Sequence, residues 1–155
     1  MSAPGPGAVR HFTASAFVTH VGRTLLLLHS QKHLWLPPGG HLERDEEPAP
    51  AAVREVWEET GLRVEITSPR VPAGIPHAAP RPEASLAVEI EPGHIHLDLV
   101  YFARLAPGAP SGPLRPNEEA AELRWWTAAE LTRGEGRLPP AVAALALMAV
   151  EGAGP

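Results

Sequence analysis

Alternation of apolar and polar residues predicts most of the strands in this chain. His11–His20 and Thr24–Ser30 are rich in residues that favour extended backbone, and segment 21–23 between them predicts a turn. His94–Leu105 alternates most regularly and is the clearest strand. Shorter strands are expected at further apolar segments, which are Leu34–Leu36, Val64–Ile66, Leu86–Ile90 and Leu123–Thr127.

Three segments carry the signals of helices. Pro48–Thr60 begins with a proline where no amide donor is needed, follows Glu47, which can cap it, and stops at Gly61. Thr127 can cap a second, short helix, and Pro139–Val150 is rich in Ala and Leu. Strands and helices are mixed without strict β–α alternation, so we expect an α+β fold rather than a doubly wound parallel sheet.

The composition fits one globular domain of 155 residues. Hydrophobic residues make up 44% of the chain and charged residues 20%, which is typical of a protein with a buried core. The 19 prolines and 14 glycines predict long loops at residues 68–85 and 106–117, and we expect residues 1–10 to be flexible. The absence of cysteine excludes disulfides, thiolate metal sites and cysteine nucleophiles. Without a signal-peptide pattern or a long apolar run, we expect a soluble cytoplasmic protein with no membrane partner.

Negative charge is concentrated in one segment. Seven acids and two bases lie between Gly40 and Leu62, whereas acids and bases balance over the rest of the chain. Such a run is either a solvated acidic face or a site for divalent cations, because crowded carboxylates repel one another unless a cation lies among them. The chain has no basic stripe to meet the phosphates of duplex nucleic acid, so we expect no such partner.

Helical spacing brings the acids of this segment together. Glu55 lies three residues before Glu58 and four before Glu59, so the three side chains leave neighbouring positions on one side of the predicted helix. Arg54 lies four residues before Glu58, and their pairing would hold that carboxylate in place. Carboxylates clustered on a rigid helix suit Mg²⁺ or Mn²⁺. The glycine-rich bend before the helix would bring backbone carbonyls close to the same ion.

The same segment resembles the Nudix box, whose pattern is G-x5-E-x7-R-E-U-x-E-E-x-G-U, with U a bulky aliphatic residue. All nine specified positions are filled over 23 residues, by Gly40, Glu46, Arg54, Glu55, Val56, Glu58, Glu59, Gly61 and Leu62. The resemblance extends upstream to Trp35–Gly40, which is similar to the strand and turn that usually precede the box. A chance match at this many fixed positions is very improbable, although the box covers only about a seventh of the chain.

This resemblance implies a Nudix fold, a mixed β-sheet sandwiched between α-helices in an α/β/α arrangement. It also implies that water attacks phosphorus in a nucleoside diphosphate linked to another moiety, with Mg²⁺ or Mn²⁺ as the cofactor. By position in the box, the resemblance assigns the metal ligands to Glu58, Glu59, Glu55 and the Gly39 carbonyl. Arg54 would orient Glu58, and Glu46 would support the ligands without binding the metal itself.

The resemblance leaves open which carboxylate takes the proton of the attacking water. Some family members use a box glutamate, here Glu55, and others use one from a distant loop. The loop candidates are Glu118 and Glu119, just before the last predicted strand, and Glu83 in the proline-rich loop. We select Glu119 as an additional metal ligand or base, with a solvated loop acid as the alternative.

Alternate positions of one predicted strand carry His94, His96 and Asp98, which therefore share a face. Such a set could form a transition-metal triad, but three ligands in a row along one strand span too far to chelate easily. The favoured interpretation is a polar face that lines the substrate cleft, and structural histidines are the remaining alternative. Arg70 and Arg81 could contact a phosphate or the second moiety of the substrate, or they could simply be solvated.

The adjacent Trp125 and Trp126 would point to opposite faces of their strand. We therefore expect at most one of them to pack inward, and the other could stack on a base. Trp35 is expected to be structural.

Sequence marks outside the box do not identify the substrate. We predict a divalent-metal-dependent pyrophosphohydrolase that acts on a small nucleoside-diphosphate-type molecule. One alternative is a Nudix-fold module that senses or binds a nucleotide without turnover, although such modules typically show a degraded box. Another is a metalloenzyme centred on residues 94–98. Homodimers are common among similar proteins, so a homodimer is expected by analogy alone.

Overall fold

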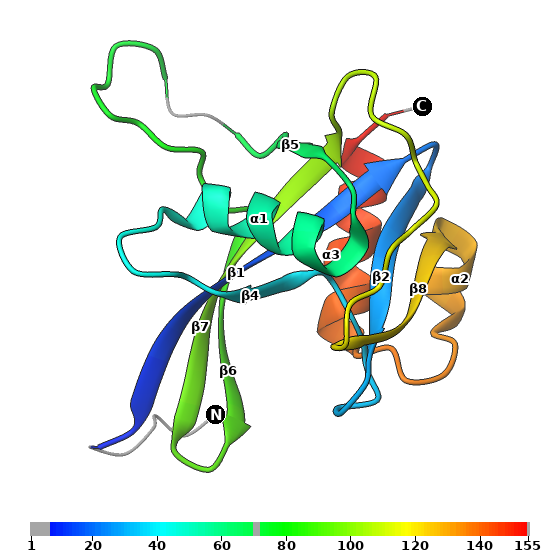
Figure 1. Cartoon of the computed structure of the whole chain (residues 1–155), viewed down its shortest axis with the longest axis horizontal. Helices are drawn as coiled ribbons and strands as arrows, with labels where there is room; N and C mark the ends of the chain where they lie inside the picture. Colours follow the sequence, from blue (N-terminus) through cyan, green and yellow to red (C-terminus); the bar gives the residue numbers. More distant parts are fainter. Residues whose placement is uncertain (1–6, 70–71, 155) are drawn as a thin grey trace.

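A computed structural model describes residues 7–69 and 72–154 of the chain (Figure 1). Arg70, a candidate substrate contact, and residues 1–6, part of the segment expected to be flexible, lie outside the described residues. The strands are β1 (Val9–His20), β2 (Arg23–His29), β3 (Trp35–Leu36), β4 (Gly39–His41), β5 (Val64–Ile66), β6 (Ala84–Glu91), β7 (His94–Leu105) and β8 (Ala120–Thr127). The helices are α1 (Pro48–Thr60), α2 (Ala128–Arg133) and α3 (Pro140–Gly152). In the described part of the chain, no helix has both the length and the apolar character needed to cross a membrane.

The strands within the described residues form one mixed sheet around β1. β7 runs parallel to β1 along almost its whole length, from Val9 opposite His94 to Thr19 opposite Arg104. On the other edge, β1 changes partner: β4 pairs with residues 13–15, and β2 pairs with residues 19–20. The sheet therefore splits along this edge, because β2 continues into β3 and β8 while β4 stays on β1.

Two hydrophobic clusters cover the two faces of the sheet. Ala14, Ala16 and Val18 belong to the cluster that includes buried residues of α1, whereas Phe17 belongs to the cluster that includes residues of α3. Because successive side chains of a strand face opposite ways, α1 and α3 lie on opposite faces. Figure 1 shows α1 in front of the sheet and α3 behind it. The predicted α/β/α sandwich with a mixed sheet is therefore confirmed.

Strand β4 is the element that the sequence pattern missed, since residues 37–40 were expected to form a loop. Gly39 and Gly40 give a local signal for a bend, but a long-range partner, β1, holds them in extended pairing. β1 also begins at Val9, inside the segment expected to be flexible, while β6 and β8 begin at Ala84 and Ala120, earlier than expected. The bounds predicted for β5 and β7 are confirmed.

Both tryptophans of β8 pack inward, so the prediction that at most one would do so is wrong. Trp126 is fully buried in the cluster beside α3, and its ring centroid lies 5.1 Å from that of Trp35. Trp125 packs against the cluster beside α1. Because both faces of the sheet are covered, side chains that point to either face of a strand are buried in a hydrophobic cluster. Trp35 is buried, as expected.

Candidate active site

Helix α1 presents its acids in a fixed orientation because both of its ends are set by the sequence. Glu47 occupies the cap position, but its side chain makes no capping bond, contrary to expectation. Pro48 and Pro50 lie in the first turn and have no N–H, so among the first three helical residues only Ala49 has an N–H to be capped. Gly61 ends the helix in the left-handed region, with φ 74°, as predicted. Val56 is fully buried, which holds one face of the helix against the sheet.

Arg54 joins the acids that surround it. Its Nε and Nη2 each donate to Glu46 at 2.9 Å, and its Nη1 donates to Glu55 at 2.9 Å and to Glu58 at 3.1 Å. Nη2 also donates to the carbonyl oxygen of His41 at 3.0 Å. The expected pairing of Arg54 with Glu58 is therefore confirmed. The two-pronged contact with Glu46 is the larger interaction, and it lowers the pKa of that carboxyl.

Two carboxyls of the box, those of Glu55 and Glu59, are buried, and the positive charge of Arg54 does not offset the cost of burying them as anions. Glu59 is only 3% exposed, and burial raises its pKa to about 8, against the effect of the Gly39 N–H, which donates to Oε2 at 2.9 Å. Negative neighbours, Glu55 and Glu119 among them, raise it further. Burial likewise raises the pKa of Glu55, and Arg54 opposes that shift. This oxygen-rich donor set with a deficit of positive charge fits a hard divalent cation.

Gly39 and Gly40 of β4 lie too close to their neighbours for a side chain to fit. A Cβ atom on Gly39 would lie 2.6 Å from the Cβ of Ser15, and one on Gly40 would lie 2.5 Å from Oε1 of Glu55. Both distances are shorter than real contacts of a Cβ atom allow. β4 can therefore pass between β1 and the carboxylates of α1 only because these residues have no side chain.

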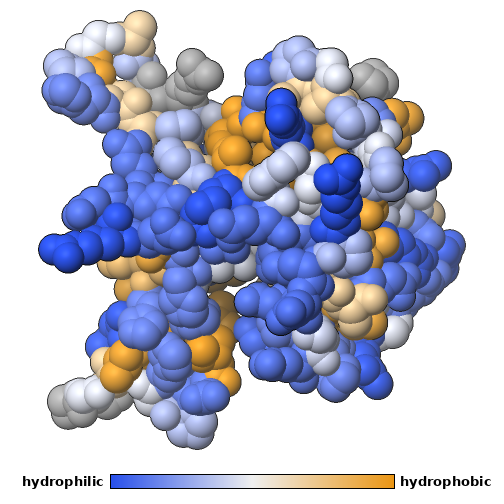
Figure 2. All heavy atoms as spheres, viewed as in Figure 1, coloured by the Kyte–Doolittle hydropathy of each residue, from blue (hydrophilic) through white to orange (hydrophobic). Residues whose placement is uncertain are grey.

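A cavity of about 330 Å³ is lined by β1 and β4 residues where β1 changes partner. Glu59 lines it from α1, Glu119 from the segment before β8, and Asp98 from β7. Nitrogen-bearing side chains in its wall are Lys32, His29, His41 and His96. Figure 2 shows a recess between the arm formed by β6 and β7 and the part of the molecule that carries β2, with hydrophilic residues gathered over α1.

Asp98 is held by two hydroxyls of β1. Thr13 Oγ1 donates to one carboxylate oxygen at 3.0 Å, and Ser15 Oγ donates to the other at 2.7 Å. Burial raises the pKa of Asp98, and these two bonds oppose the increase. Asp98 is not among the described side chains whose metal-binding atoms converge with those of His94 and His96. The transition-metal triad considered from the sequence is therefore not formed.

The other candidates among the described residues lie at the margin of this cavity or away from it. Glu58 is half exposed beside Arg54 on the surface of α1. Glu83 lines a different cavity, and Glu118 is an exposed residue whose carbonyl oxygen accepts from Ser30 Oγ. Arg81 lies in the loop between β5 and β6, with its N–H bonded to the Pro69 carbonyl. Of the loop acids considered, Glu119 is the one that the fold brings to the box.

Sequence analysis missed Lys32, Thr13 and Ser15 as parts of the cavity wall. Lys32 lies between β2 and β3, where no periodic pattern indicates which way a side chain points. Thr13 lies opposite Asp98 in the parallel register, and Ser15, two residues further along β1, lies opposite Val100 but also bonds Asp98. Their polarity inside the buried part of β1, beside Ala14, Ala16 and Phe17, was the available signal.

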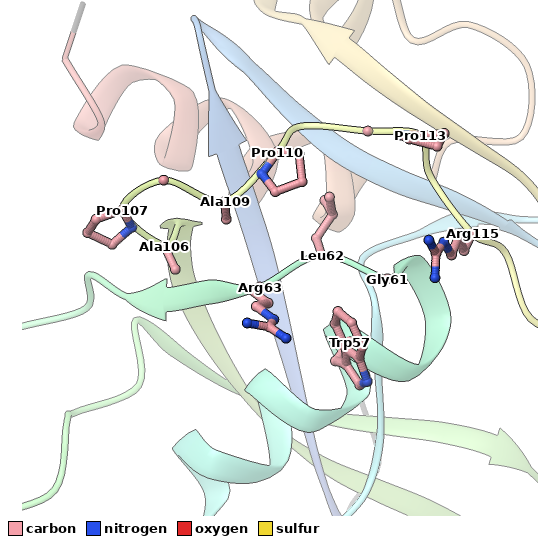
Figure 3. Close-up of a pocket in the computed structure, with 12 residues that line it drawn as sticks. Trp57, Gly61, Leu62, Arg63, Ala106, Pro107, Ala109, Pro110, Pro113 and Arg115 are labelled. Atoms are coloured by element: carbon pink, nitrogen blue, oxygen red, sulfur yellow. The ribbon is translucent and has the colours of Figure 1, made fainter.

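A larger cavity of about 450 Å³ lies at the carboxyl end of α1 (Figure 3). Trp57 and Arg63 meet there, with the guanidinium carbon 5.5 Å from the indole centroid, and prolines of loop 106–115 form the opposite wall. The described residues that line it include no acid. Its lining offers no carboxylate to a cation, so the smaller cavity beside Glu59 is the candidate active site.

Comparisons with known proteins show the family to which this chain belongs. The family model described as NUDIX domain matches residues 9–145. A MutT-like protein of Streptomyces ambofaciens is 30% identical over 142 residues, which cover 92% of this chain and 77% of that protein. The human m7GpppN-mRNA hydrolase NUDT17 is 32% identical over 115 residues, which cover 73% of this chain but only 34% of that protein.

A solved structure shows the same fold. A hydrolase of the NUDIX family from Clostridium perfringens superposes with a TM-score of 0.81 at 28% identity, and the match covers 92% of this chain and 97% of that one. The box, the sandwich around it and these relatives agree with one another. The chain belongs to the Nudix hydrolase family and is a Nudix pyrophosphatase, an enzyme that acts on phosphoric anhydride bonds.

Proposed function

We propose that this enzyme uses Mg²⁺ or Mn²⁺ to hydrolyse a pyrophosphate bond in a nucleoside diphosphate linked to another moiety. The observation that carries the proposal is the cavity lined at once by Glu59 of the box helix and Glu119 of a distant loop. Around these two acids the negative charge of the carboxylates exceeds the positive charge that Arg54 supplies. A pyrophosphate could enter such a place only together with cations.

Glu55, Glu58 and Glu59 would hold the metal, and the Gly39 carbonyl would add a neutral oxygen ligand. When bound, a divalent cation neutralises phosphate oxygens and lowers the pKa of water beside the phosphorus. Arg54 positions two of these ligands through its bonds to Glu55 and Glu58, and Glu46 in turn fixes the guanidinium.

Glu119 would accept the proton of the attacking water on its carboxylate, with Glu55 as the alternative base. The water oxygen forms a bond to one phosphorus, and the bond between that phosphorus and the bridging oxygen breaks. The bridging oxygen leaves with the second phosphate, and the proton ends on the carboxylate. Glu119 is suited to this role because it lines the same cavity as Glu59 but comes from a different segment of the chain.

The opposite wall of the cavity would bind the substrate. Lys32 can pair with phosphate oxygens, and His96 and Asp98 offer a hydrogen-bonding surface to the rest of the molecule. His94 lies beside His96, with ring centroids 5.2 Å apart, and would support it. Arg81 would contribute only from the outer end of a long substrate, because its loop lies apart from the residues that line the cavity.

The test is a hydrolysis screen with Mg²⁺ and with Mn²⁺. Substrates would include nucleoside triphosphates, oxidised nucleotides, nucleotide sugars, ADP-ribose, dinucleotides and capped RNA; the last is included because the human relative is named an m7GpppN-mRNA hydrolase. We expect metal-dependent turnover that is abolished in Glu58→Gln and retained in Glu151→Gln, a matched change on an exposed helical position of α3. Nucleotide binding without turnover in the wild type would favour the sensing module instead.

A second pair of variants tests the loop acid. Glu118 and Glu119 are neighbours in sequence and are both exposed, but only Glu119 is among the residues that line the cavity. We expect Glu119→Gln to lower kcat by about 100-fold and Glu118→Gln to leave it unchanged. Equal activity of the two variants would show that Glu119 is not the base and would favour Glu55 in that role.

A further inference from the structure

Four histidines from three strands surround one point near the start of β7. His11 comes from β1, His41 from β4, and His94 and His96 from β7. One ligand atom from each lies within 4.8 Å of the corresponding atom of every other. Asp98, which the sequence pattern grouped with His94 and His96, is bonded to Thr13 and Ser15 instead, so the cluster is made of imidazoles alone.

The rings form a closed circuit of edge-to-face contacts. Their centroids are 5.4 Å apart for His11 and His41, 4.6 Å for His41 and His96, 5.2 Å for His96 and His94, and 4.9 Å for His94 and His11. The planes of neighbouring rings are inclined by 68° to 81°. The four rings therefore face a shared centre rather than stacking in a row.

These distances match the geometry of a tetrahedral ion. A nitrogen about 2.0–2.1 Å from Zn²⁺ places its ring centroid about 3.2 Å from the ion, so two rings on tetrahedral directions lie about 5.2 Å apart. The observed circuit of 4.6–5.4 Å brackets that separation. Ligand nitrogens around such an ion lie about 3.3 Å apart, so the present 4.8 Å limit would close by at most about 1.5 Å through small ring rotations.

The two inner histidines have nitrogens that lack a partner. The Nε2 atoms of His94 and His96 are buried, and no described residue gives either of them a hydrogen bond. Buried polar atoms of this kind are uncommon and call for a bound ion, a water or another partner. Burial, followed by the neighbouring histidines, also lowers the pKa of His96 to about 4. Neutral imidazole is the form that binds metals.

We propose that His11, His41, His94 and His96 form a binding site for a divalent transition-metal ion of the Zn²⁺ class, separate from the carboxylate site. Imidazole nitrogens prefer Zn²⁺, Ni²⁺, Co²⁺ or Cu²⁺, whereas the glutamates of α1 prefer Mg²⁺ or Mn²⁺. Four protein ligands leave no open position, so the site is structural rather than catalytic. The ion would bind β1, β4 and β7 to one another.

The site adjoins the active-site cavity, and this gives it a consequence for function. His41 and His96 also line that cavity, and His41 lies next to Gly40, which packs against Glu55. An ion on the four histidines would fix the wall of the cavity and restrain β4. The inference does not rest on the proposed hydrolysis, because it needs none of the glutamates.

Cobalt provides the direct test, since Co²⁺ absorbs strongly in the visible range when it is tetrahedral and weakly when it is octahedral and bound by oxygen. We expect one equivalent of Co²⁺ to give the tetrahedral spectrum with the wild-type protein, and Zn²⁺ to displace it. X-ray absorption of the zinc-loaded protein should show four nitrogen ligands at about 2.0 Å. A wild-type protein that gives only the octahedral spectrum would overturn the proposal without any variant.

Four variants, two of them controls, locate the ion. His11→Ala, at an exposed position of β1, should abolish the tetrahedral spectrum and weaken Zn²⁺ binding at least about tenfold, while circular dichroism shows the fold intact. His77→Asn changes an exposed histidine outside the cluster, with φ 58°, and should retain the site. Glu58→Gln should lose hydrolysis but keep the cobalt spectrum, which separates the two sites. Retention of the spectrum in His11→Ala and in His94→Gln would contradict the assignment.

Discussion

Two arginine-centred clusters in this molecule are built from the same residue types but differ in their charge balance. Arg54 of α1 binds Glu46, Glu55 and Glu58, while Arg124 of β8 binds Glu130 at 2.6 Å and Glu135 at 3.1 Å beside α2. In the Arg124 cluster each acid has a bonded donor, and a second arginine, Arg133, also pairs with Glu135. In the Arg54 cluster, one guanidinium is shared among several acids.

The two clusters differ in the pKa values of their acids, although in both of them an arginine lowers the pKa of one acid, which is Glu46 beside Arg54. The backbone N–H of Thr127, followed by Arg124, lowers the pKa of Glu130 to about 2. Burial raises the pKa of Glu55, and it raises that of Glu59 to about 8. A lowered carboxyl pKa indicates an interaction that stabilises the fold, and a raised one indicates a charge that the fold alone does not satisfy. The difference separates a structural cluster from a site that requires a ligand.

The largest expected effect comes from Glu59→Gln. We expect kcat/KM to fall about 1,000-fold because a metal ligand is lost. Thermal stability of the metal-free protein should not fall, since glutamine can still accept the bond from the Gly39 N–H and cannot ionise in the buried site. Steady-state kinetics and calorimetry check the two outcomes. A large loss of stability with activity retained would place Glu59 in a structural role.

Local signals explain why the sequence identified so much of this site. Pro48 and Gly61 mark the ends of α1, and helical spacing alone brings Arg54 to Glu58. Both depend on residues a few positions apart. The same reasoning identified Thr127 as the cap of α2, where the side chain accepts from the Glu130 N–H.

Long-range pairing explains what the sequence did not show. β4 was missed because its pairing with β1 outweighs the bending tendency of Gly39 and Gly40. His41 joins His94 and His96 only through that pairing, so the histidine cluster has no linear pattern. The register of β1 on β7 likewise decides that Asp98 bonds hydroxyls. Such contacts depend on the assembled sheet and leave no periodic trace in one segment.

The next largest effect is expected from a pair of glycine substitutions, one beside each arginine cluster. Gly40→Ala would force the carboxylate of Glu55 to move, because the new Cβ would lie 2.5 Å from Oε1, and we expect kcat to fall about 100-fold. Gly134→Ala, at the end of α2, has free space around its Cβ but a φ of 66°. It should cost about 1 kcal/mol of stability and leave kcat unchanged. A loss of activity in both variants would show that the two regions are coupled.

The two arginines can be exchanged for lysine as a matched pair. Lysine cannot reproduce the fork that Arg54 makes with Glu46 while also reaching Glu55, so Arg54→Lys should lower kcat/KM about tenfold. Arg124→Lys should leave kcat/KM unchanged and lower stability by about 1 kcal/mol or less, because its pairs are partly exposed. Equal activity losses would contradict the division into a reactive and a structural cluster.

The smallest effect concerns the pH dependence of stability in the Arg124 cluster. Because the folded state lowers the pKa of Glu130 from its ordinary value of 4.5 to about 2, its contribution is complete above about pH 4.5 and is lost as the pH falls toward 2. Glu130→Gln keeps a capping side chain but removes the charge, so it should be less stable than wild type by about 1 kcal/mol at pH 7. That difference should vanish toward pH 2 in urea unfolding, and Glu151→Gln, on the exposed end of α3, should show no such trend. A difference that stays constant from pH 7 to pH 2 would mean that Glu130 acts through its shape rather than its charge.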